Sequence, residues 1–361
     1  MIKNKKILIL SLSTGSGHTR AAEAIKKTIL QQYPHINVEH IDMLHYLSNP
    51  FKRATVDAYD LLIKTSPELW GILYKHSNNA TFLNITNKYS KKIKNFNTKK
   101  LHKYLQEYQP NYIISTHFFC TDIYLSGKEK HSCNAPISTV ITDYRLHELW
   151  LVDNTDHYFV PTEQIKTQMI ERGIDKQTIT VSGIPIDPVF YQNIPPQKKQ
   201  TDTNILVMSG GQGLGQVEKI VKSLTKTLSF PYTITAITGK NKKLQKKLKK
   251  QNNPNITVIG WTNNIEQYMR RADIIISKPG GLTTTECITL GKPLIAINPI
   301  PGQEEANAQY IEKHGYGLVA KSITDLPQLI QQAKKLQITT KKIQKSGEII
   351  LQTILQKKDN E

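Results

Sequence analysis

The chain has 361 residues, of which 38% are hydrophobic and 21% are charged, so it is long and apolar enough for two domains and is not a disordered sequence. Its 48 Lys and Arg residues outnumber its 29 Asp and Glu residues, which gives a formal net charge of +19. This charge indicates an anionic partner: nucleic acid, an anionic membrane or a phosphorylated substrate. An A/T-rich genome that favours lysine codons would raise the charge without any such partner.

Three cysteines, Cys120, Cys133 and Cys287, lie far apart and lack the spacing of metal ligands. They predict a reducing compartment and no disulfide framework. Residues 1–13 combine a basic start with a short apolar run, but no small-residue cleavage site follows, so we expect a first strand rather than a signal peptide. No segment approaches the roughly 18 apolar residues of a membrane-spanning helix. The sequence therefore predicts a cytoplasmic protein that is soluble or peripheral on the membrane.

The first predicted unit is a βαβ arrangement with a glycine-rich turn. A continuous apolar run at 7–12 predicts a strand covered on both faces, and it is followed by a helix at 19–33 and a strand at 37–42. The turn contains Gly17 but lacks the third glycine of a dinucleotide fingerprint. His18 is more informative, because a first βα loop opens onto the carboxyl ends of the strands, where α/β sheets bind ligands. A histidine that only caps the turn is the alternative.

Residues 45–105 have a helical pattern in which aromatic and basic residues are interleaved. Such a segment suits the headgroup level of an anionic bilayer, where rings insert and ammonium groups meet phosphates. An ordinary helical insertion with its aromatic residues in the core would show the same pattern. The aromatic residues are Phe51, Tyr59, Trp70, Tyr74, Phe82, Tyr89 and Phe96.

Two further strands of the first half, near 112–114 and 137–141, end in polar residues. Carboxyl ends of parallel strands share one edge of a sheet, so we expect the residues that follow them to converge with His18. These residues are His117, Asp143 and His147. The segment 191–203 is rich in proline and polar residues and predicts a linker between two domains.

The second half contains two predicted anion sites. A strand at 204–208 is followed by a loop with four glycines. A strand at 274–276 is followed by a glycine-containing turn and then by a helix that begins near Leu282. Free backbone N–H groups and the positive end of the helix dipole converge at such a helix start. Glu286, which we expect on the first turn of that helix, suits a ribose diol. The polar loop at 301–307 would lie beside this pocket and contact the group that is attached to the diphosphate.

The chain is thus expected to form an α/β protein of two doubly wound Rossmann-like domains, at 1–195 and 203–335, that face a ligand cleft. Residues 336–361 are expected to form a basic C-terminal helix that would pack back on the first domain. The simplest interpretation of the lysines in this tail is a solvated helix face, and the alternative is that they add to the attraction to a membrane.

The sequence carries the motifs GSGHTRAAEAI (15–25), VITDYRLHELW (140–150), DHYFVPT with VSGIPIDPVF (156–190), MSGGQGLG (208–215), and SKPGGLTTTEC with GKPLIAINPIPGQEEANA (277–308). Together they resemble the diacylglycerol glycosyltransferases, namely the monogalactosyldiacylglycerol synthases and the bacterial processive diacylglycerol β-glucosyltransferases. These are relatives of the peptidoglycan enzyme that adds N-acetylglucosamine to a lipid intermediate. The resemblance covers nearly the whole chain, and the combination of motifs is specific although no single motif is.

The resemblance implies the glycosyltransferase B fold, a nucleotide-sugar donor and no metal ion. It implies that His18 is the general base for the acceptor hydroxyl, and that Asp143 orients His18 or contacts the acceptor. Glu286 would hold the ribose, the backbone near Thr262 would meet the uracil, and Gln303 and Glu304 would reach the sugar. The implied donor-binding residues are Gly17, Gly210, Gly211, Gly213, Thr262, Gly281, Thr283, Thr284, Glu286, Gln303, Glu304 and Asn307.

The expected function is an inverting transfer of a hexose, glucose rather than galactose, from a UDP-sugar to diacylglycerol on the inner face of the cell membrane. The expected partners are the UDP-sugar, diacylglycerol and the anionic membrane surface, and no cofactor is expected. One alternative is an enzyme that uses UDP-N-acetylglucosamine and a polyprenyl-linked peptidoglycan intermediate. Another is a non-catalytic sensor of UDP-sugars. Nucleic-acid binding is disfavoured, because the basic residues are spread over several helices instead of lining one groove.

Overall fold

The structure is a computed structural model that describes residues 5–13, 15–52, 65, 66, 68, 71, 98–128, 133–193, 201–208, 216–339 and 345–356. The chain divides into two compact units. Unit 1 comprises Met1–Pro188, Pro301–Gln303 and Gln344–Glu361, and unit 2 comprises Val189–Ile300 and Glu304–Ile343. The aromatic and basic segment at 45–105 lies largely outside the described residues, so its predicted membrane contact stays a prediction.

Unit 1 is built on a six-stranded parallel sheet with the order β2-β1-β3-β4-β5-β6. Successive side chains of a strand point to opposite sides of the sheet, and those of the first strand are buried on both sides. Leu8 and Leu10 belong to one hydrophobic cluster, and Ile7 and Ile9 belong to another. The strands are β1 (Lys6–Ser11), β2 (Asn37–Asp42), β3 (Tyr112–Ser115), β4 (Ile137–Val140), β5 (His157–Val160) and β6 (Ile179–Val181).

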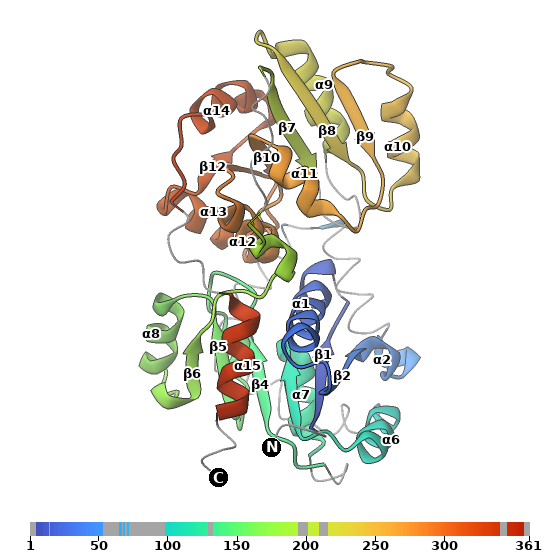
Figure 1. Cartoon of the computed structure of the whole chain (residues 1–361), viewed down its shortest axis with the longest axis vertical. Coiled ribbons are helices and arrows are strands. Elements are labelled where there is room, and N and C mark those ends of the chain that lie inside the picture. The colour runs from blue at the N-terminus through green and yellow to red at the C-terminus, as the bar shows by residue number, and fades with distance from the viewer. Residues whose placement is uncertain are drawn as a thin grey trace. The chain divides into compact units, whose positions relative to one another are not determined.

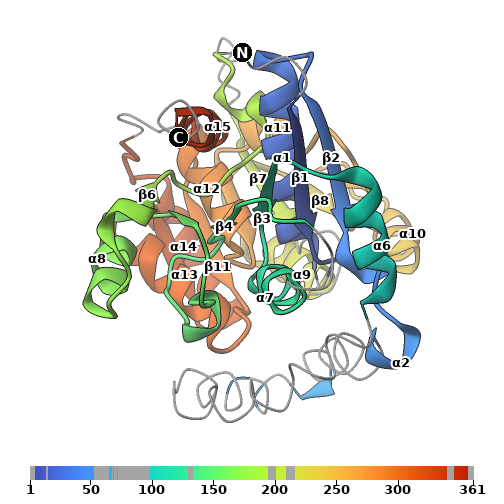
Figure 2. The same ribbon diagram turned by 90° about the horizontal axis from the view of Figure 1, so that it is seen from below.

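Helices cover both faces of this sheet. Figure 2 shows α1 and α15 on one side of the strands and α7 on the other, which agrees with the two hydrophobic clusters. The α-helices of the unit are α1 (Ser16–Gln32), α2 (Asn49–Lys52), α6 (Lys99–Tyr108), α7 (Phe118–Ser126), α8 (Glu163–Glu171) and α15 (Ser346–Gln356). The short 3₁₀ helices are η1 (Met43–His45), η3 (Glu148–Trp150) and η4 (Lys176–Thr178), and η5 (Pro188–Tyr191) spans the boundary between the units.

The C-terminal helix α15 packs against α1, as the red and blue helices of Figure 1 show. Ile350 and Ile354 share a hydrophobic cluster with Ile25 and Ile29 of α1. A Cβ atom at Gly347 would lie 2.5 Å from the Thr28 hydroxyl oxygen, so this close helix crossing requires glycine. The tail from 325 onward is not one helix, because residues 336–339 separate α14 from α15 and are not helical.

Unit 2 is built on a second six-stranded parallel sheet with the order β12-β11-β10-β7-β8-β9. The strands are β7 (Thr203–Met208), β8 (Tyr232–Ile237), β9 (Ile256–Ile259), β10 (Ile274–Ser277), β11 (Leu294–Ile297) and β12 (Gly317–Ala320). The helices are α9 (Val217–Thr227), α10 (Lys242–Lys249), α11 (Ile265–Arg271), α12 (Gly281–Leu290), α13 (Gln303–Lys313), η6 (Ile323–Asp325) and α14 (Leu326–Ala333). Helices α9, α10 and α14 contribute to one hydrophobic cluster on a face of this sheet.

Each sheet has a point at which the strand order reverses direction. In unit 1 the reversal lies between β1 and β3, and in unit 2 it lies between β7 and β10. Open α/β sheets bind ligands outside the carboxyl ends of the strands at this switch point. We therefore expect ligands at the loops after β1 and β3 in unit 1 and at those after β7 and β10 in unit 2. No helix in the described part of the chain is long and apolar enough to span a membrane.

Candidate functional site

His18 lies at the switch point of unit 1. It is the third residue of α1, which follows β1 through a turn in which Gly15 has a φ of 144°, a value that L side chains rarely adopt. No described atom lies within 4 Å of a Cβ built at Gly17, so crowding is no reason for glycine there. Gly15 thus sets the direction of the backbone into α1, and no described atom crowds Gly17 beside His18.

The hydrogen bonds of His18 define its neutral tautomer. Its Nδ1 atom lies 2.8 Å from the carbonyl oxygen of Thr116, which follows β3, and a carbonyl can only accept. Nδ1 therefore carries the proton, and Nε2 holds the lone pair. The Thr142 hydroxyl, after β4, lies 3.1 Å from the same Nδ1. Burial lowers the pKa of His18 to about 4, against the opposing effect of the Thr116 hydrogen bond, so the ring is neutral at pH 7.

His18 is part of an aromatic cluster formed by residues at the starts of α1 and α7 and in η3. Its ring centroid lies 4.4 Å from that of His117 in an edge-to-face arrangement and 6.2 Å from that of Trp150. Phe118 lies 5.6 Å from Trp150 on the other side. Burial and the neighbouring His18 hold the pKa of His117 well below its usual value. The cluster therefore keeps two adjacent imidazoles uncharged in an apolar setting.

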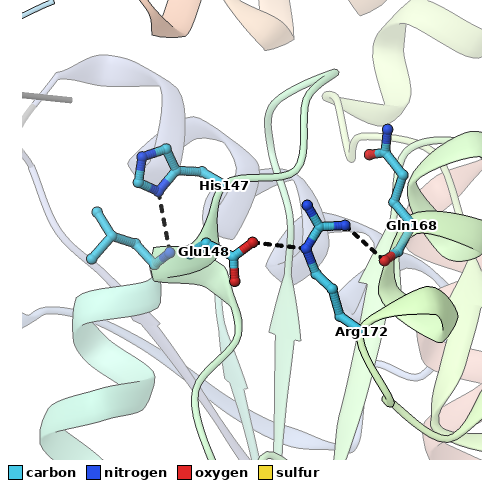
Figure 3. Close-up of polar contacts among 5 residues, drawn as sticks. His147, Glu148, Gln168 and Arg172 are labelled. Carbon is cyan, nitrogen blue, oxygen red and sulfur yellow. Dashed lines mark hydrogen bonds and ion pairs between the residues drawn. The ribbon is translucent and has the colours of Figure 1, made fainter. Parts of the chain in front are cut away.

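His117 and His147 use Nδ1 differently from His18. His117 accepts a hydrogen bond at Nδ1 from the Phe119 N–H at 3.1 Å and caps α7, and His147 accepts one from the Leu149 N–H at 3.1 Å and caps η3. Figure 3 shows this second cap. Both rings therefore have an unprotonated Nδ1. The predicted convergence of His18 with His117 is confirmed. His147 uses its Nδ1 atom to cap η3.

Figure 3 also shows how the loop after β4 is fixed to α8. The Glu148 carboxylate accepts from Arg172 Nε at 2.7 Å, and Arg172 donates through Nη1 to the Gln168 carbonyl at 2.9 Å. Asp143 lies in the same loop, is only 6% exposed and directly follows Thr142. Its role as an orienting or acceptor-binding residue stays a prediction. The contacts described at His18 Nδ1 come from Thr116 and Thr142, two residues that sequence reasoning missed although they follow the ends of neighbouring strands.

In unit 2 the helix α12 begins at the switch point. Its N-cap is Gly280, which has no side chain to cap the helix, and the Thr284 N–H bonds to the Gly280 carbonyl at 2.9 Å. The preceding amides, from Gly281 to Thr283, are those that a helix cannot satisfy internally. The Thr284 hydroxyl is buried and has no hydrogen-bond partner among the described residues. Donors and the positive dipole end therefore meet where an anion was predicted.

Glu286 is not on the first turn of this helix, as the sequence had suggested. The helix begins at Gly281, so Glu286 is its sixth residue and lies on the second turn. Its side chain is 1% exposed. Burial, and then the neighbouring Glu286 carboxylate, raise the pKa of Cys287 well above its usual value. The carboxylate thus lies deeper than expected, about one turn behind the helix-start amides.

The predicted polar loop at 301–307 is helical from Gln303, where α13 begins. The Glu304 carboxylate accepts from the Ile300 N–H at 2.7 Å through Oε2, and a Cβ built at Gly280 would lie 3.9 Å from its Oε1. Burial raises the pKa of Glu304 while the Lys278 charge opposes this. The start of α13 therefore lies beside the start of α12, as the adjoining motifs had suggested.

Several predicted donor residues are less fully described. Asn307 is completely buried on α13, and Thr262 accepts from the Asn264 N–H at 3.1 Å in the loop after β9. The side chain of Gln303 lies outside the described residues. The glycine loop after β7, with Gly210, Gly211 and Gly213, also lies outside them. Its predicted role at the diphosphate stays a prediction.

Comparison with known families gives two matches, one in each half of the chain. Residues 18–186 match the family model of monogalactosyldiacylglycerol synthase, and residues 204–356 match the C-terminal domain of glycosyltransferase family 28. The chain is 31% identical over 333 residues to the processive diacylglycerol beta-glucosyltransferase of Staphylococcus aureus strain MRSA252. This alignment covers 88% of the chain and 82% of the relative.

Solved structures with a similar fold are more distant in sequence. MurG of Acinetobacter baumannii is 16% identical with a TM-score of 0.58, over 98% of this chain and 99% of that one. A UDP complex of S. aureus MnaA is 15% identical with a TM-score of 0.62, over 97% and 96% of the two chains. These similarities show the fold, and the expected glycosyltransferase B fold with its two doubly wound sheets is confirmed.

Proposed function

The chain belongs to the diacylglycerol glycosyltransferase family, and we propose that it transfers a hexose from a UDP-sugar to diacylglycerol with inversion at the anomeric carbon. The observation that carries the proposal is the tautomer of His18. Its Nδ1 proton is held by the Thr116 carbonyl, so Nε2 is the atom of the ring that accepts a proton.

Unit 1 supplies the base in this proposal. The hydroxyl of diacylglycerol attacks the anomeric carbon, its proton passes to His18 Nε2, and the bond from the sugar to the diphosphate breaks. Burial keeps His18 neutral at pH 7 and hence ready to accept the proton. The Thr116 carbonyl and Thr142 hydroxyl stabilise the imidazolium that forms, because both lie at Nδ1.

Unit 2 supplies most of the proposed donor residues. The amides at the start of α12 would face the diphosphate and stabilise the charge that develops as UDP leaves. Glu286 would hold the ribose, the loop at Thr262 the uracil, and Gln303, Glu304 and Asn307 the sugar hydroxyls. The proximity of Glu304 to Gly280 supports this division, because the proposed sugar ligand then lies beside the helix start that is proposed to bind the diphosphate.

We propose that this helix start takes the place of a metal ion, since its N–H donors and dipole act on the same diphosphate oxygens that a cation would. Glucose is the proposed sugar, because the bacterial relative with 31% identity is named a glucosyltransferase. The proposed location is the inner face of the cell membrane, where diacylglycerol would be met in an anionic bilayer. The net charge of +19 supports attraction to that surface.

The stereochemistry of the product tests this chemistry. Proton NMR of the glycolipid made from UDP-glucose in the presence of EDTA should show a β-glucoside, because direct displacement inverts the α linkage of the donor. UDP-galactose offered in parallel should give less product. An α-glucoside would contradict direct displacement by the acceptor, and a product that forms only after Mg²⁺ is added back would contradict the metal-free proposal.

A further inference from the structure

The helix α10 carries a lysine-rich face for which none of the roles above accounts. Lys242, Lys243, Lys246, Lys247, Lys249 and the C-cap residue Lys250 are all exposed. Leu244 and Leu248 point the other way and pack into the hydrophobic cluster of unit 2. With 3.6 residues per turn, the six lysines occupy about half of the helix circumference. We call this set of six lysines the α10 face.

The α10 face keeps most of its positive charge. Lys247 pairs with Glu218 at 2.9 Å, and Glu218 also pairs with Lys222 at 2.7 Å. These two lysines lower the pKa of Glu218, which therefore stays an anion at neutral pH. The other five lysines of the face have no ion pair with a described residue. Six lysines this close together repel one another when no anion is bound, and an anionic partner would relieve this repulsion.

Trp261 lies at the N-terminal end of the same helix and is 51% exposed. The Lys240 ammonium lies 5.0 Å from the centroid of its ring, and Lys240 directly precedes the N-cap of α10. The indole N–H donates to Asn263 Oδ1 at 3.2 Å. A Cβ at the neighbouring Gly260 would lie 2.9 Å from the Gln245 side chain, so the Trp261 loop packs directly on α10.

We propose that the α10 face and Trp261 form a docking surface on unit 2 for an anionic phospholipid bilayer. Ammonium groups meet lipid phosphates, and the indole ring sits at the headgroup level, where tryptophan is favoured because it is apolar with one polar edge. Nucleic acid fits less well, since single-stranded binding uses several stacking aromatics along a groove, and among the described residues we find one exposed aromatic ring, Trp261, beside the α10 face. The proposal rests on the proposed function in that the acceptor is a bilayer lipid.

Vesicle co-sedimentation without any sugar donor tests the lysines. The variant Lys242→Gln, Lys243→Gln, Lys246→Gln should bind phosphatidylglycerol vesicles about 10²-fold more weakly, at roughly fivefold for each lysine. The matched control Lys313→Gln, Lys321→Gln, Lys335→Gln removes the same charge from exposed lysines near β12, at the other edge of the sheet. It should bind nearly as the wild type does. Equal losses in both variants, or no loss in the α10 variant, would overturn the proposal.

Lipid-borne bromine quenchers test the tryptophan. In a Trp70→Phe background, the fluorescence of Trp261 should be quenched by brominated phosphatidylglycerol, and the further change Trp261→Phe should abolish that quenching. Trp150 is 2% exposed and serves as the unquenched internal reference. Protection of Trp261 by UDP without any lipid quenching would assign the ring to the nucleotide and overturn its membrane role.

Two further outcomes separate this proposal from its alternatives. If the α10 variant loses affinity for RNA and keeps its affinity for vesicles, the surface binds nucleic acid and the membrane assignment is wrong. The chain could instead bind vesicles through the α10 face and yet transfer no sugar. This result would support the docking surface and refute the proposed function. UDP affinity of the α10 variant should be unchanged, which excludes loss of folding as the cause.

Discussion

Replacing His18 with alanine is expected to lower the kcat for glycosyl transfer by roughly 10²- to 10⁴-fold and to leave UDP affinity nearly unchanged. The reason is that the ring lies in unit 1, whereas the proposed donor residues lie in unit 2 apart from Gly17 and Gln303. A pKa of about 4 makes the neutral ring a weak base, which favours the lower part of this range. Steady-state kinetics with saturating diacylglycerol and UDP titration calorimetry measure the two quantities.

The pH dependence gives this prediction a second readout. Only neutral His18 accepts a proton, so activity should be present above its folded pKa and be lost as pH falls through about 4. The matched control is His35→Ala, an exposed histidine in the turn after α1, which should leave kcat unchanged. If His18→Ala loses UDP affinity as much as kcat, the histidine is a phosphate ligand or a structural residue and the base assignment fails.

Replacing Glu286 with glutamine is expected to weaken UDP binding by roughly 10- to 100-fold, because a charge-assisted hydrogen bond to a buried carboxylate is worth about 1.5–3 kcal/mol. The change keeps the size of a side chain that is 1% exposed, so packing in α12 should survive. Calorimetric titration with UDP and with its 2′,3′-dideoxy analogue measures the effect. The analogue lacks the ribose hydroxyls and should bind the wild type and the variant equally.

The comparison of the two nucleotides isolates the ribose contact. Glu312→Gln, an exposed change on α13, is the matched control and should bind both nucleotides normally. Equal weakening of UDP and of the dideoxy analogue by Glu286→Gln would show that the carboxylate supports the site only indirectly. Normal UDP affinity in that variant would refute its ribose role outright.

The periodic segments of the fold were predictable from the sequence. The strand at 37–42 begins and ends at the predicted residues, and the strands predicted at 137–141, 204–208 and 274–276 each differ from the structure by one residue at one end, because alternating or continuous apolar patterns bounded by polar turns define them. His18 was identified from its place after a first strand, since strand ends in a parallel sheet share one edge. The order of the strands then brings His117 to within 4.4 Å of it.

What the sequence did not reveal depends on tertiary contacts. The partner of His18 is the backbone carbonyl of Thr116, and every residue has such a carbonyl, so the residue type at this position does not predict the contact. Helix α13 was read as a loop because the prolines and glycine before Gln303 resemble loop sequence, and Glu304 then reaches back to the Ile300 N–H. Glu286 was placed on the first turn of a helix expected to begin near Leu282, but the helix begins at Gly281, and a turn of about 3.6 residues ends before its sixth residue.

Transfer of radiolabel from UDP-glucose to diacylglycerol measures the proposed reaction itself. Purified full-length protein would be given labelled donor and vesicles of phosphatidylglycerol that contain diacylglycerol, with EDTA present. We expect label in the lipid phase that depends on diacylglycerol and is nearly absent with His18→Ala. Measurable UDP binding without any lipid label, from UDP-glucose or from UDP-galactose, would contradict it.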